Sequence, residues 1–478
     1  MTIPTIDTTP TTGSRLGDEA LDGLDARITA RLRAPGYREW RAQVEATGGC
    51  AAPVHLLGSS RVLDRDGAVL LERTGTVLAP CGNRRATVCP SCSDRYAADA
   101  FHLLRAGLAG DDSKDVPDSV TEHPRAFLTL TAPSFGPVHA RTLTPRGHVI
   151  PCRCGERHPD DDPRIGTALD PHGYDYTGAV LWQAHAGALW ARFTIALRRA
   201  IAALLGVKGA EFREHARLSY AKVAEYQRRG LVHFHAVIRL DGPDGPTDPP
   251  PTGLDLTALR AAIIDAATAS TLTVQRPDRT ALRLGWGPQH DLREVTPTAR
   301  AQIEGEDGEI TDAALAGYIA KYATKTTGAT QGADRPIRDI AHVEFLRISD
   351  HHRRMITTAW ELGGDERYDA LNLRRWAHML GFRGHFLTKS QRYSTTFKQL
   401  RGRRRTWRLL TDLAQLDHDT DDPNTIPPDP DTITVINDWW PVRYGHRDDA
   451  EHELAHAIAE RRRATRQTRT PISEGRTA

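Results

Sequence analysis

The sequence has few of the features that mark secreted proteins, membrane proteins or helicases. Six cysteines in 478 residues are too few for a disulfide framework. No apolar run approaches the roughly 20 residues of a bilayer-spanning helix, and residues 1–13 show no charged-then-apolar leader. We therefore expect a cytoplasmic protein without a membrane partner. The absence of a Gly-x4-Gly-Lys-Ser/Thr loop also argues against a relaxase joined to a helicase.

The net charge of the chain is close to zero, at +2 from 63 basic and 61 acidic residues. Such a balance does not by itself indicate a nucleic-acid partner, so any basic surface must come from local clustering. A chain of this length can bury a large core and can form two to four domains.

The most informative stretch is residues 223–239, which alternates like a β-hairpin. His233 and His235 are two apart on one strand, so they share a face about 7 Å apart and can bind one divalent cation. Glu225 on the other arm becomes a third ligand if the loop is three residues long (228–230). A two-residue loop would turn it to the opposite face. The alternative is that the histidines are structural.

A second stretch, residues 317–325, is Ala-rich and predicted to be helical. Tyr318 and Tyr322 are four apart and share a helix face, and Lys321 and Lys325 follow them at the same offset. A cation beside tyrosines suits phosphodiester transfer, in which a phenol oxygen attacks phosphorus. The alternative is that the tyrosines are half-buried packing residues.

The cysteines come as close pairs, which predicts a structural zinc ion in a reducing cytoplasm. We expect one site made of Cys89, Cys92, Cys152 and Cys154, with Cys81 able to replace one of them. His102 or His158 would belong to a separate site. The alternative is reduced, buried thiols.

Residues 127–131 form a predicted strand that precedes the histidine hairpin. Thr129 and Thr131 share one face of it, which we expect to line the active site and touch DNA. The alternative is an ordinary half-exposed strand.

These stretches resemble the motifs of HUH-type rolling-circle replication initiators, and specifically the RepSA-like initiators of actinobacterial plasmids. The resemblance covers residues 75–410 and rests on CGNRRATVCPSCS, FLTLTAPSFGPVH, AKVAEYQRRGLVHFHAVIRLDG, YIAKYATK and LRRWAHMLGFRGHFLTKS, in that order. The paired tyrosines also resemble those of the gene A initiators of small isometric phages.

The resemblance implies an α+β endonuclease fold with a central antiparallel sheet and helices packed on it. It implies Mg²⁺ or Mn²⁺ at the histidines, and Tyr322 as nucleophile, because single-tyrosine relatives resemble that position. Tyr318 would be its partner. Attack would leave a 5′-phosphotyrosine and a free 3′-hydroxyl, and the strand would later be rejoined. Partners would be origin DNA, single-stranded at the nick, with a host helicase and polymerase.

Beyond residue 327 the chain becomes basic. Residues 373–408 hold eleven Lys or Arg residues and no acid, interleaved with aromatics, which predicts contact with DNA phosphates and unpaired bases. The candidate contacts are Arg383, Lys389, Arg392, Arg401, Arg403, Arg404 and Arg405. The alternative is a solvated basic surface over an aromatic core.

We therefore expect five segments. They are a partly disordered, then helical region (1–75), a zinc-binding segment interleaved with the first catalytic strand (76–160), the endonuclease domain (120–330), a mostly helical basic DNA-binding region (331–412), and a flexible linker with a charged helical tail (413–478). The competing functions are a transposase or relaxase of the same catalytic type and a non-catalytic, zinc-bearing DNA-binding regulator.

Overall fold

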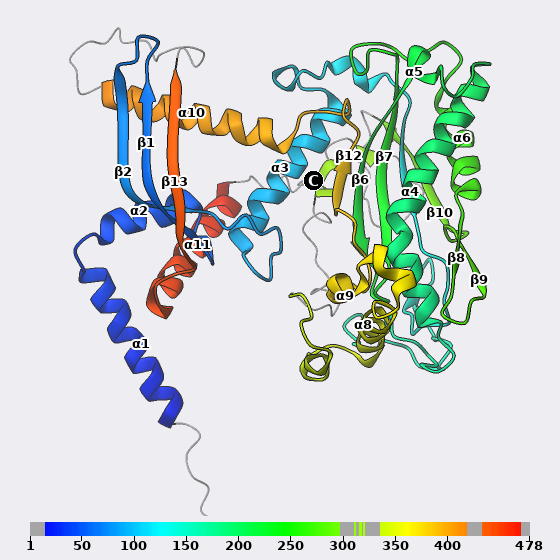
Figure 1. The fold of residues 1–478 in the computed structure, drawn as a ribbon, viewed down its shortest axis with the longest axis horizontal. Helices are drawn as coiled ribbons and strands as arrows, with labels where there is room; N and C mark the ends of the chain where they lie inside the picture. The colour runs from blue at the N-terminus through cyan, green and yellow to red at the C-terminus, as the bar shows by residue number, and fades with distance from the viewer. Residues whose placement is uncertain are drawn as a thin grey trace, which may run out of the picture. The chain divides into compact units, whose positions relative to one another are not determined.

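The chain forms two compact units (Figure 1). The central unit comprises residues 97–401, and the terminal unit combines residues 1–96 with 402–478. Both contain helices and antiparallel strands, which confirms the predicted α+β class. The computed structural model describes residues 15–296, 310–311, 315–317, 319–320, 335–417 and 433–469.

Among the described residues, a six-stranded sheet forms the middle of the central unit, in the order β11-β10-β3-β7-β6-β12. Neighbouring strands are antiparallel except β10 and β11, which are parallel. The strands are β3 (Arg125–Leu130), β6 (Arg217–Tyr226), β7 (Val232–Asp241), β10 (His290–Thr296), β11 (Ile310–Thr311) and β12 (Leu387–Lys389).

Side-chain alternation gives this sheet two different faces. On β3, Ala126, Leu128 and Leu130 belong to the main hydrophobic core, as do Phe234 and Ala236 on β7. The residues between them, which include both histidines of the His-x-His pair, therefore point to the opposite face.

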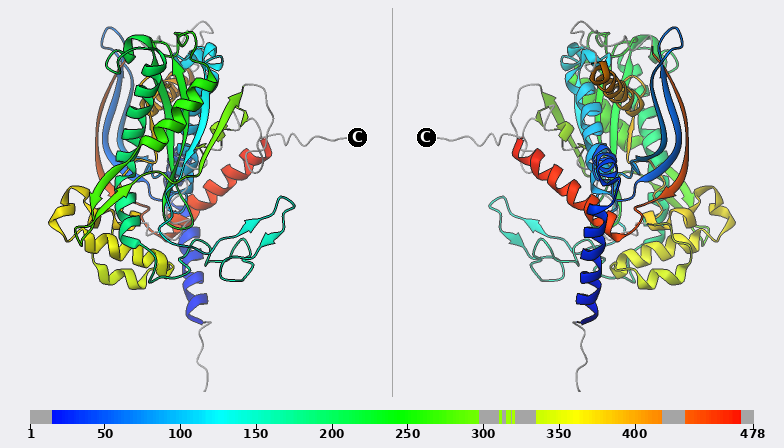
Figure 2. Two further views of the ribbon diagram at one scale, coloured as in Figure 1. Left: turned by 90° about the vertical axis from the view of Figure 1, so that its right-hand side faces the viewer. Right: turned by 90° about the vertical axis from the view of Figure 1, so that its left-hand side faces the viewer.

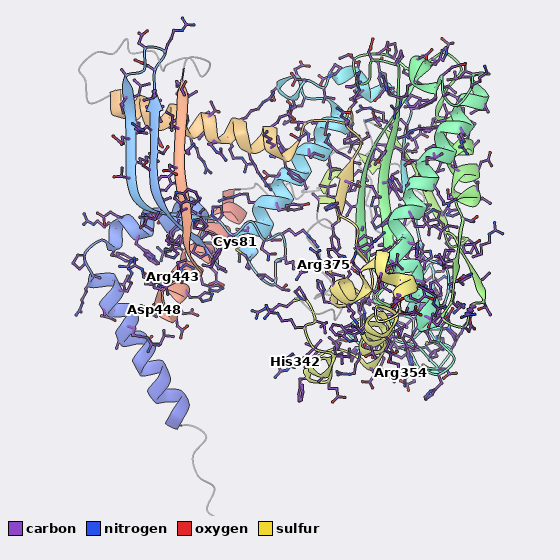
Figure 3. All side chains as sticks on the ribbon, viewed as in Figure 1. Cys81, His342, Arg354, Arg375, Arg443 and Asp448 are labelled. Atoms are coloured by element: carbon purple, nitrogen blue, oxygen red, sulfur yellow. The ribbon has the colours of Figure 1, made fainter. Side chains whose placement is uncertain are left out.

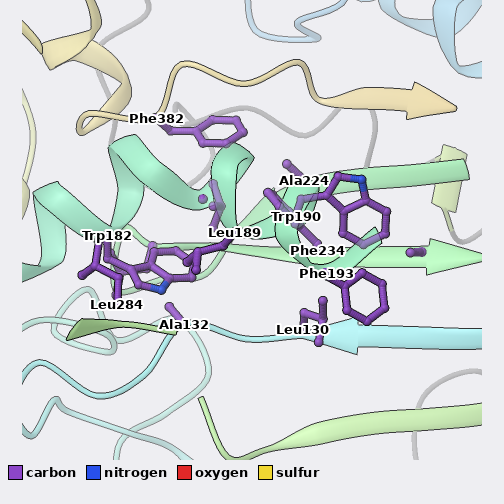
Figure 4. Close-up of a cluster of buried hydrophobic side chains, with 14 of the residues drawn as sticks. Leu130, Ala132, Trp182, Leu189, Trp190, Phe193, Ala224, Phe234, Leu284 and Phe382 are labelled. Carbon is purple, nitrogen blue, oxygen red and sulfur yellow. The ribbon is translucent and has the colours of Figure 1, made fainter. Parts of the chain in front are cut away.

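Helix α4 (Tyr176–Leu204) fills the core face. The Asp175 carboxylate caps its start by accepting a 2.8 Å hydrogen bond from the Gly178 N–H. Figure 4 shows its side chains beside Phe234 of β7 and Leu130 of β3. The apolar stripe of this helix is buried and consists of Leu181, Leu189, Trp190, Phe193, Leu197 and Ile201.

Shorter elements complete the central unit. The helices are α5 (Phe212–His215), α6 (Leu256–Ala269), α8 (Asp350–Leu362) and α9 (Leu373–Trp376). The 3-10 turns are η1 (Asp112–Lys114), η2 (Asp118–Thr121), η4 (Ile340–Phe345), η5 (Glu366–Leu371) and η6 (Ala377–Met379). Two small hairpins are β4 (Thr142–Leu143) with β5 (Val149–Ile150), and β8 (Leu272–Gln275) with β9 (Ala281–Leu284).

In the part of the terminal unit that the structure describes, a three-stranded sheet has the order β13-β1-β2. Its strands are β1 (Val54–Leu63), β2 (Val69–Ala79) and β13 (Thr434–Tyr444). Helices α1 (Arg15–Arg33), α2 (Tyr37–Thr47) and α11 (Asp449–Arg469) accompany it. Trp40, Val44 and Ala455 form a small core there. The two units divide within α3 (Pro90–Ala109) and α10 (Phe397–Asp417).

The two units do not coincide with the predicted segments. Strand β12 and the buried Phe382 and Phe386 belong to the central unit, although they fall within the expected separate region 331–412. Strand β13 was not predicted at all, and it pairs with β1 over the full length of that strand. The expected disorder of residues 1–15 and the linker around 417–431 fall almost wholly outside the described residues.

None of the described helices is both long and apolar enough to cross a membrane.

Candidate metal centre

The β6–β7 hairpin brings Glu225 and His233 face to face as direct cross-strand partners. Its loop is closed by two backbone hydrogen bonds, Gln227 N–H to Leu231 O at 2.8 Å and Gly230 N–H to Gln227 O at 2.9 Å. Three residues, 228–230, therefore form the loop, and the predicted register that places Glu225 beside the histidines is confirmed. Gly230 has φ of 76°, a left-handed value that favours glycine.

The ligand atoms of the three side chains form a nearly equilateral triangle. Glu225 Oε2 lies 2.9 Å from His233 Nε2 and 3.1 Å from His235 Nε2, and the two Nε2 atoms are 3.1 Å apart. Three ligands on one face of an octahedron with metal–ligand bonds of about 2.1 Å lie about 3.0 Å apart. The triangle therefore fits one face of an octahedral cation site.

Thr129 and Phe127 of β3 fix the ring of His235. Thr129 Oγ1 lies 3.1 Å from His235 Nδ1, and the Phe127 ring stacks on the imidazole with centroids 5.7 Å apart. A histidine that binds metal through Nε2 carries its proton on Nδ1 and donates it to such an oxygen. Burial lowers the pKa of His235 to about 4, which keeps the ring neutral and able to act as a ligand.

The group is more open on one side than on the other. The His235 side chain is 4% exposed, whereas His233 and Glu225 retain 18% and 11% exposure. Three protein donors leave further positions of an octahedral ion for water or substrate. Such a group would enter from the more exposed side, next to His233 and Glu225.

The predicted threonine face is only partly explained. Thr129 contacts His235 Nδ1 through its hydroxyl, so it orients a candidate ligand. Thr131 lies just beyond the end of β3 and is half-buried, and its carbonyl oxygen accepts a 2.7 Å hydrogen bond from the Gly287 N–H. Contact of either threonine with DNA stays a prediction.

The predicted tyrosine helix is described only in fragments. Residues 315–317 and 319–320 are helical, and Leu315, Ala316 and Ile319 are fully buried. The four candidate catalytic residues of this stretch lie outside the described residues: Tyr318, Lys321, Tyr322 and Lys325. Their assignment stays a prediction.

The cysteines group differently from the prediction. Cys89 and Cys92 are joined by Cys50 and Cys81, and three of the Sγ–Sγ distances are 3.7 Å. Thiolates around a tetrahedral zinc with bonds of about 2.3 Å lie about 3.8 Å apart, so these four cysteines fit a zinc ion. Hydrogen bonds, first from Cys50 and then from Cys92, lower the pKa of Cys89 and favour its thiolate. Cys81 of this group is labelled in Figure 3.

The prediction of a single site made of Cys89, Cys92, Cys152 and Cys154 is therefore wrong. Cys152 and Cys154 lie instead with His139 and His158 in the central unit. The expected separate site at His158 is present as a donor group, whereas His102 is exposed and belongs to neither group. Cys50 was missed because it stands alone in the sequence, 31 residues before Cys81.

Most of the predicted DNA-binding residues of the central unit have partners within the protein. Lys389 Nζ donates to backbone carbonyls, with Ser394 O at 2.9 Å, and burial lowers its pKa. Arg401 Nε donates to Asp99 Oδ2 at 3.1 Å, Arg392 to Asp244 O, and Arg383 Nη1 to Ala370 O at 2.5 Å. Each of these four residues therefore has a structural role within the protein, and contact with DNA stays a prediction for them.

Helix α10 keeps part of the predicted basic surface. Arg403 and Arg405 are exposed, Arg404 is half-buried, and Trp407 is 65% exposed. By contrast, Phe382, Phe386 and Tyr393 are buried, so they are core residues and cannot stack on bases. The alternative of a basic surface over an aromatic core thus holds for that part of the segment.

Two comparisons with known proteins give the same answer. Residues 36–460 match the profile of the RepSA family, described as replication initiator protein, pSAM2. The chain is also 45% identical over 445 residues to a replication initiator protein of Streptomyces ambofaciens. The alignment covers 91% of this chain and 92% of that protein. No solved structure matches.

Proposed function

Because the chain belongs to the RepSA family of replication initiator proteins, we propose that it initiates plasmid replication by nicking one strand of its origin and later rejoining it. The observation that carries the proposal is the Glu225–His233–His235 triangle on the sheet. The chain order of β3, the His-x-His strand and the helical residues 315–317 and 319–320 supports an HUH endonuclease fold for the central unit.

Glu225, His233 and His235 would hold the catalytic cation. One carboxylate and two neutral imidazoles suit Mg²⁺ or Mn²⁺, which supplies Lewis-acid polarisation of a scissile phosphate. Glu225 contributes the negative charge, and Thr129 keeps His235 in the ligating tautomer. His233, on the more exposed side, sits closest to the direction from which DNA would approach.

Tyr322 is the proposed nucleophile. Its phenol oxygen forms a bond to the 5′-phosphorus, the bond from phosphorus to the 3′-oxygen breaks, and the 3′-oxygen leaves as a hydroxyl after taking up a proton. A positive charge on Lys321 or Lys325 favours the phenolate, because an adjacent cation lowers the pKa of a phenol. Tyr318 would cleave or rejoin the second strand end while Tyr322 is still bonded to DNA.

Origin recognition is proposed for the exposed side of α10. Arg403 and Arg405 would contact phosphates there, and Trp407 offers a ring on which an unpaired base can stack. Replacing both arginines by glutamine should weaken binding to all sequences alike and reduce the salt dependence of binding. The exposed Lys208→Gln is the matched control for lost positive charge.

The cysteine group of the terminal unit is proposed to bind a structural zinc ion. Cys50, Cys81, Cys89 and Cys92 supply four donors and leave no open coordination position, so this ion has no role in cleavage.

Covalent trapping tests the proposal. Purified protein is incubated with single-stranded origin DNA and Mn²⁺, and a denaturation-resistant protein–DNA adduct is expected. Tyr318→Phe/Tyr322→Phe should abolish it and His235→Ala should slow its formation strongly, whereas Tyr444→Phe, at an exposed position, should leave it unchanged. An adduct that survives loss of both tyrosines contradicts the nucleophile assignment. Origin binding without any adduct indicates a non-catalytic regulator.

A further inference from the structure

We propose that His139, Cys152, Cys154 and His158 bind a second zinc ion, which folds residues 137–169 against the hairpin that carries the candidate metal centre. These residues lie between β3 and α4 in the central unit. Their donor atoms all lie within 4.8 Å of one another.

The spacing of the donor atoms fits a tetrahedral ion. His139 Nδ1 lies 3.2 Å from His158 Nε2, and Cys154 Sγ lies 3.3 Å from the same Nε2. Nitrogen ligands around a tetrahedral zinc with bonds of about 2.0 Å lie about 3.3 Å apart, and mixed nitrogen–sulfur pairs slightly farther. Two thiolates and two imidazoles complete a closed Cys2His2 donor set, which selects zinc over magnesium.

A hydrogen-bonded outer shell already orients the donors. Asp162 Oδ2 lies 2.8 Å from His158 Nδ1, so a proton on Nδ1 leaves Nε2 free to bind metal. Arg164 donates in turn to both carboxylate oxygens of Asp162. The Ala140 N–H donates to Cys152 Sγ at 3.4 Å. His158 and Asp162 are buried, at 1% and 8% exposure, although the segment around them is mostly exposed.

The part of the segment around the β4–β5 hairpin has few apolar contacts. Its β4–β5 hairpin has strands of two residues each and projects from the main sheet (Figure 2). The apolar side chains Leu143 and Ile150 are 46% and 41% exposed, so this hairpin does not form a core. A structural zinc ion replaces a missing core in segments of this kind.

The same segment touches the loop of the β6–β7 hairpin. Arg228 Nη1 donates to Asp160 O at 2.6 Å, and Gly166 packs so closely on the Arg228 backbone that a Cβ would meet its carbonyl carbon at 2.4 Å. Gly166 also has φ of 89°, a left-handed value. Arg228 follows Glu225 by three residues, so order in the zinc segment supports the position of a candidate ligand.

Zinc content of the full-length protein tests the inference without DNA, and its outcome is therefore independent of the proposed nicking activity. After dialysis against a weak chelator, elemental analysis should find two zinc ions per chain in the wild type and one in Cys152→Ser/Cys154→Ser. An unchanged zinc content in that variant overturns the proposal.

A donor-preserving variant covers the case in which the serine variant does not fold. Cys154→His should keep two metal ions and shift the visible bands of the cobalt-substituted protein, because one sulfur ligand is lost. A cobalt spectrum identical to that of the wild type overturns the assignment of Cys154.

The outer shell has its own matched pair of variants. Asp162→Asn should weaken binding of one zinc ion about 10–100-fold in chelator competition, since partners of this kind tune affinity by that factor. Asp161→Asn, at an exposed neighbouring carboxylate, should leave the affinity unchanged. Equal affinity in both variants contradicts the role given to Asp162.

Trypsin provides the structural readout. Removing zinc from the wild type should expose cleavage sites within residues 137–169, and adding zinc back should protect them. Cleavage there that does not respond to zinc contradicts the proposed folding role of the ion.

Discussion

The sheet site and the four-cysteine group hold their donors in opposite ways. Glu225, His233 and His235 stand on two paired strands whose backbone hydrogen bonds fix them before any ion binds. Cys50, Cys81 and Cys89 lie in irregular segments, and Cys92 lies in the first turn of α3. The sheet site has three donors, two of which are partly exposed. The cysteine group has four donors, which is a complete tetrahedral set.

Under the proposed function, this difference would separate a catalytic site, where ligands exchange, from a structural site, where they do not. An ion held by Glu225, His233 and His235 would keep positions for a phosphate oxygen, and the strands would not need it to stay in register. An ion among the cysteines would have no free position, and three of its four donors come from irregular segments rather than from paired strands. Loss of the ion at the sheet site should therefore reduce activity and leave the fold of the central unit intact. Loss of the ion at the four-cysteine group should instead unfold the terminal unit.

The largest effect is expected from the four-cysteine group. Cys89→Ser/Cys92→Ser should unfold the terminal unit, because structural zinc sites contribute on the order of 10 kcal/mol to folding. Limited proteolysis and circular dichroism measure the loss, with Cys81→His as a control that keeps four donors. Should the serine variant stay as protease-resistant as the wild type, the cysteine group is not a folding site.

The next effect is on chemistry alone. His235→Ala should slow adduct formation on the order of a thousandfold, because loss of cation binding removes about 4 kcal/mol of charge stabilisation. The thermal midpoint without added metal should stay close to that of the wild type. His148→Ala, at an exposed histidine in the β4–β5 turn, serves as control. An equal rate for both variants would end the distinction between the two sites.

Acid should destabilise the central unit through histidines that bind no metal. Burial, and then the neighbouring His351, lower the pKa of His352 to about 3, from an unfolded value of about 6.5. The unfolded chain binds the extra proton, so this stability is complete above pH 6.5 and falls as the pH drops toward 3. The loss at pH 4 is on the order of 3 kcal/mol. Urea unfolding of wild type and His352→Asn measures it, and the variant should show a shallower decline.

The smallest effect sharpens the role of one threonine. Thr129→Val removes the oxygen beside His235 Nδ1 and should weaken Mn²⁺ binding about 10–100-fold, measured as the Mn²⁺ midpoint of adduct formation. Thr273→Val, at an exposed position of β8, is the matched control. If Thr273→Val shifts the midpoint equally, the histidine contact does not explain the effect.

The spacing of residues within one hairpin was enough to predict the candidate ligands of the sheet site. Contacts between strands that are distant in the sequence could not be predicted. The Glu225–His233 contact follows from a three-residue loop inside one hairpin, so the alternation of nearby residues defines it. The Thr129–His235 contact joins strands 106 residues apart, and only the face of Thr129 was predictable.

The cysteines and β13 show the same limit. Close pairs such as Cys89 and Cys92 are visible in the sequence, but the residues that join them across the fold are not. Cys50 lacks a neighbouring cysteine, and β13 pairs with β1 across more than 370 positions. The β-branched and aromatic residues of β13 favour a strand, but nearly all of them are exposed, so no alternation of buried and exposed residues marks it.

The ends of the two sheets have a consequence for self-association. Within the described residues, the central sheet ends in β11 and β12, which are only two and three residues long, and such short edges offer little backbone to another chain. The terminal sheet instead ends in β2 and β13, both eleven residues long. Pro441 removes one donor from β13, and Glu72 and Arg73 place charges on β2. If concentrated protein aggregates through strand addition, the terminal sheet is where it should begin.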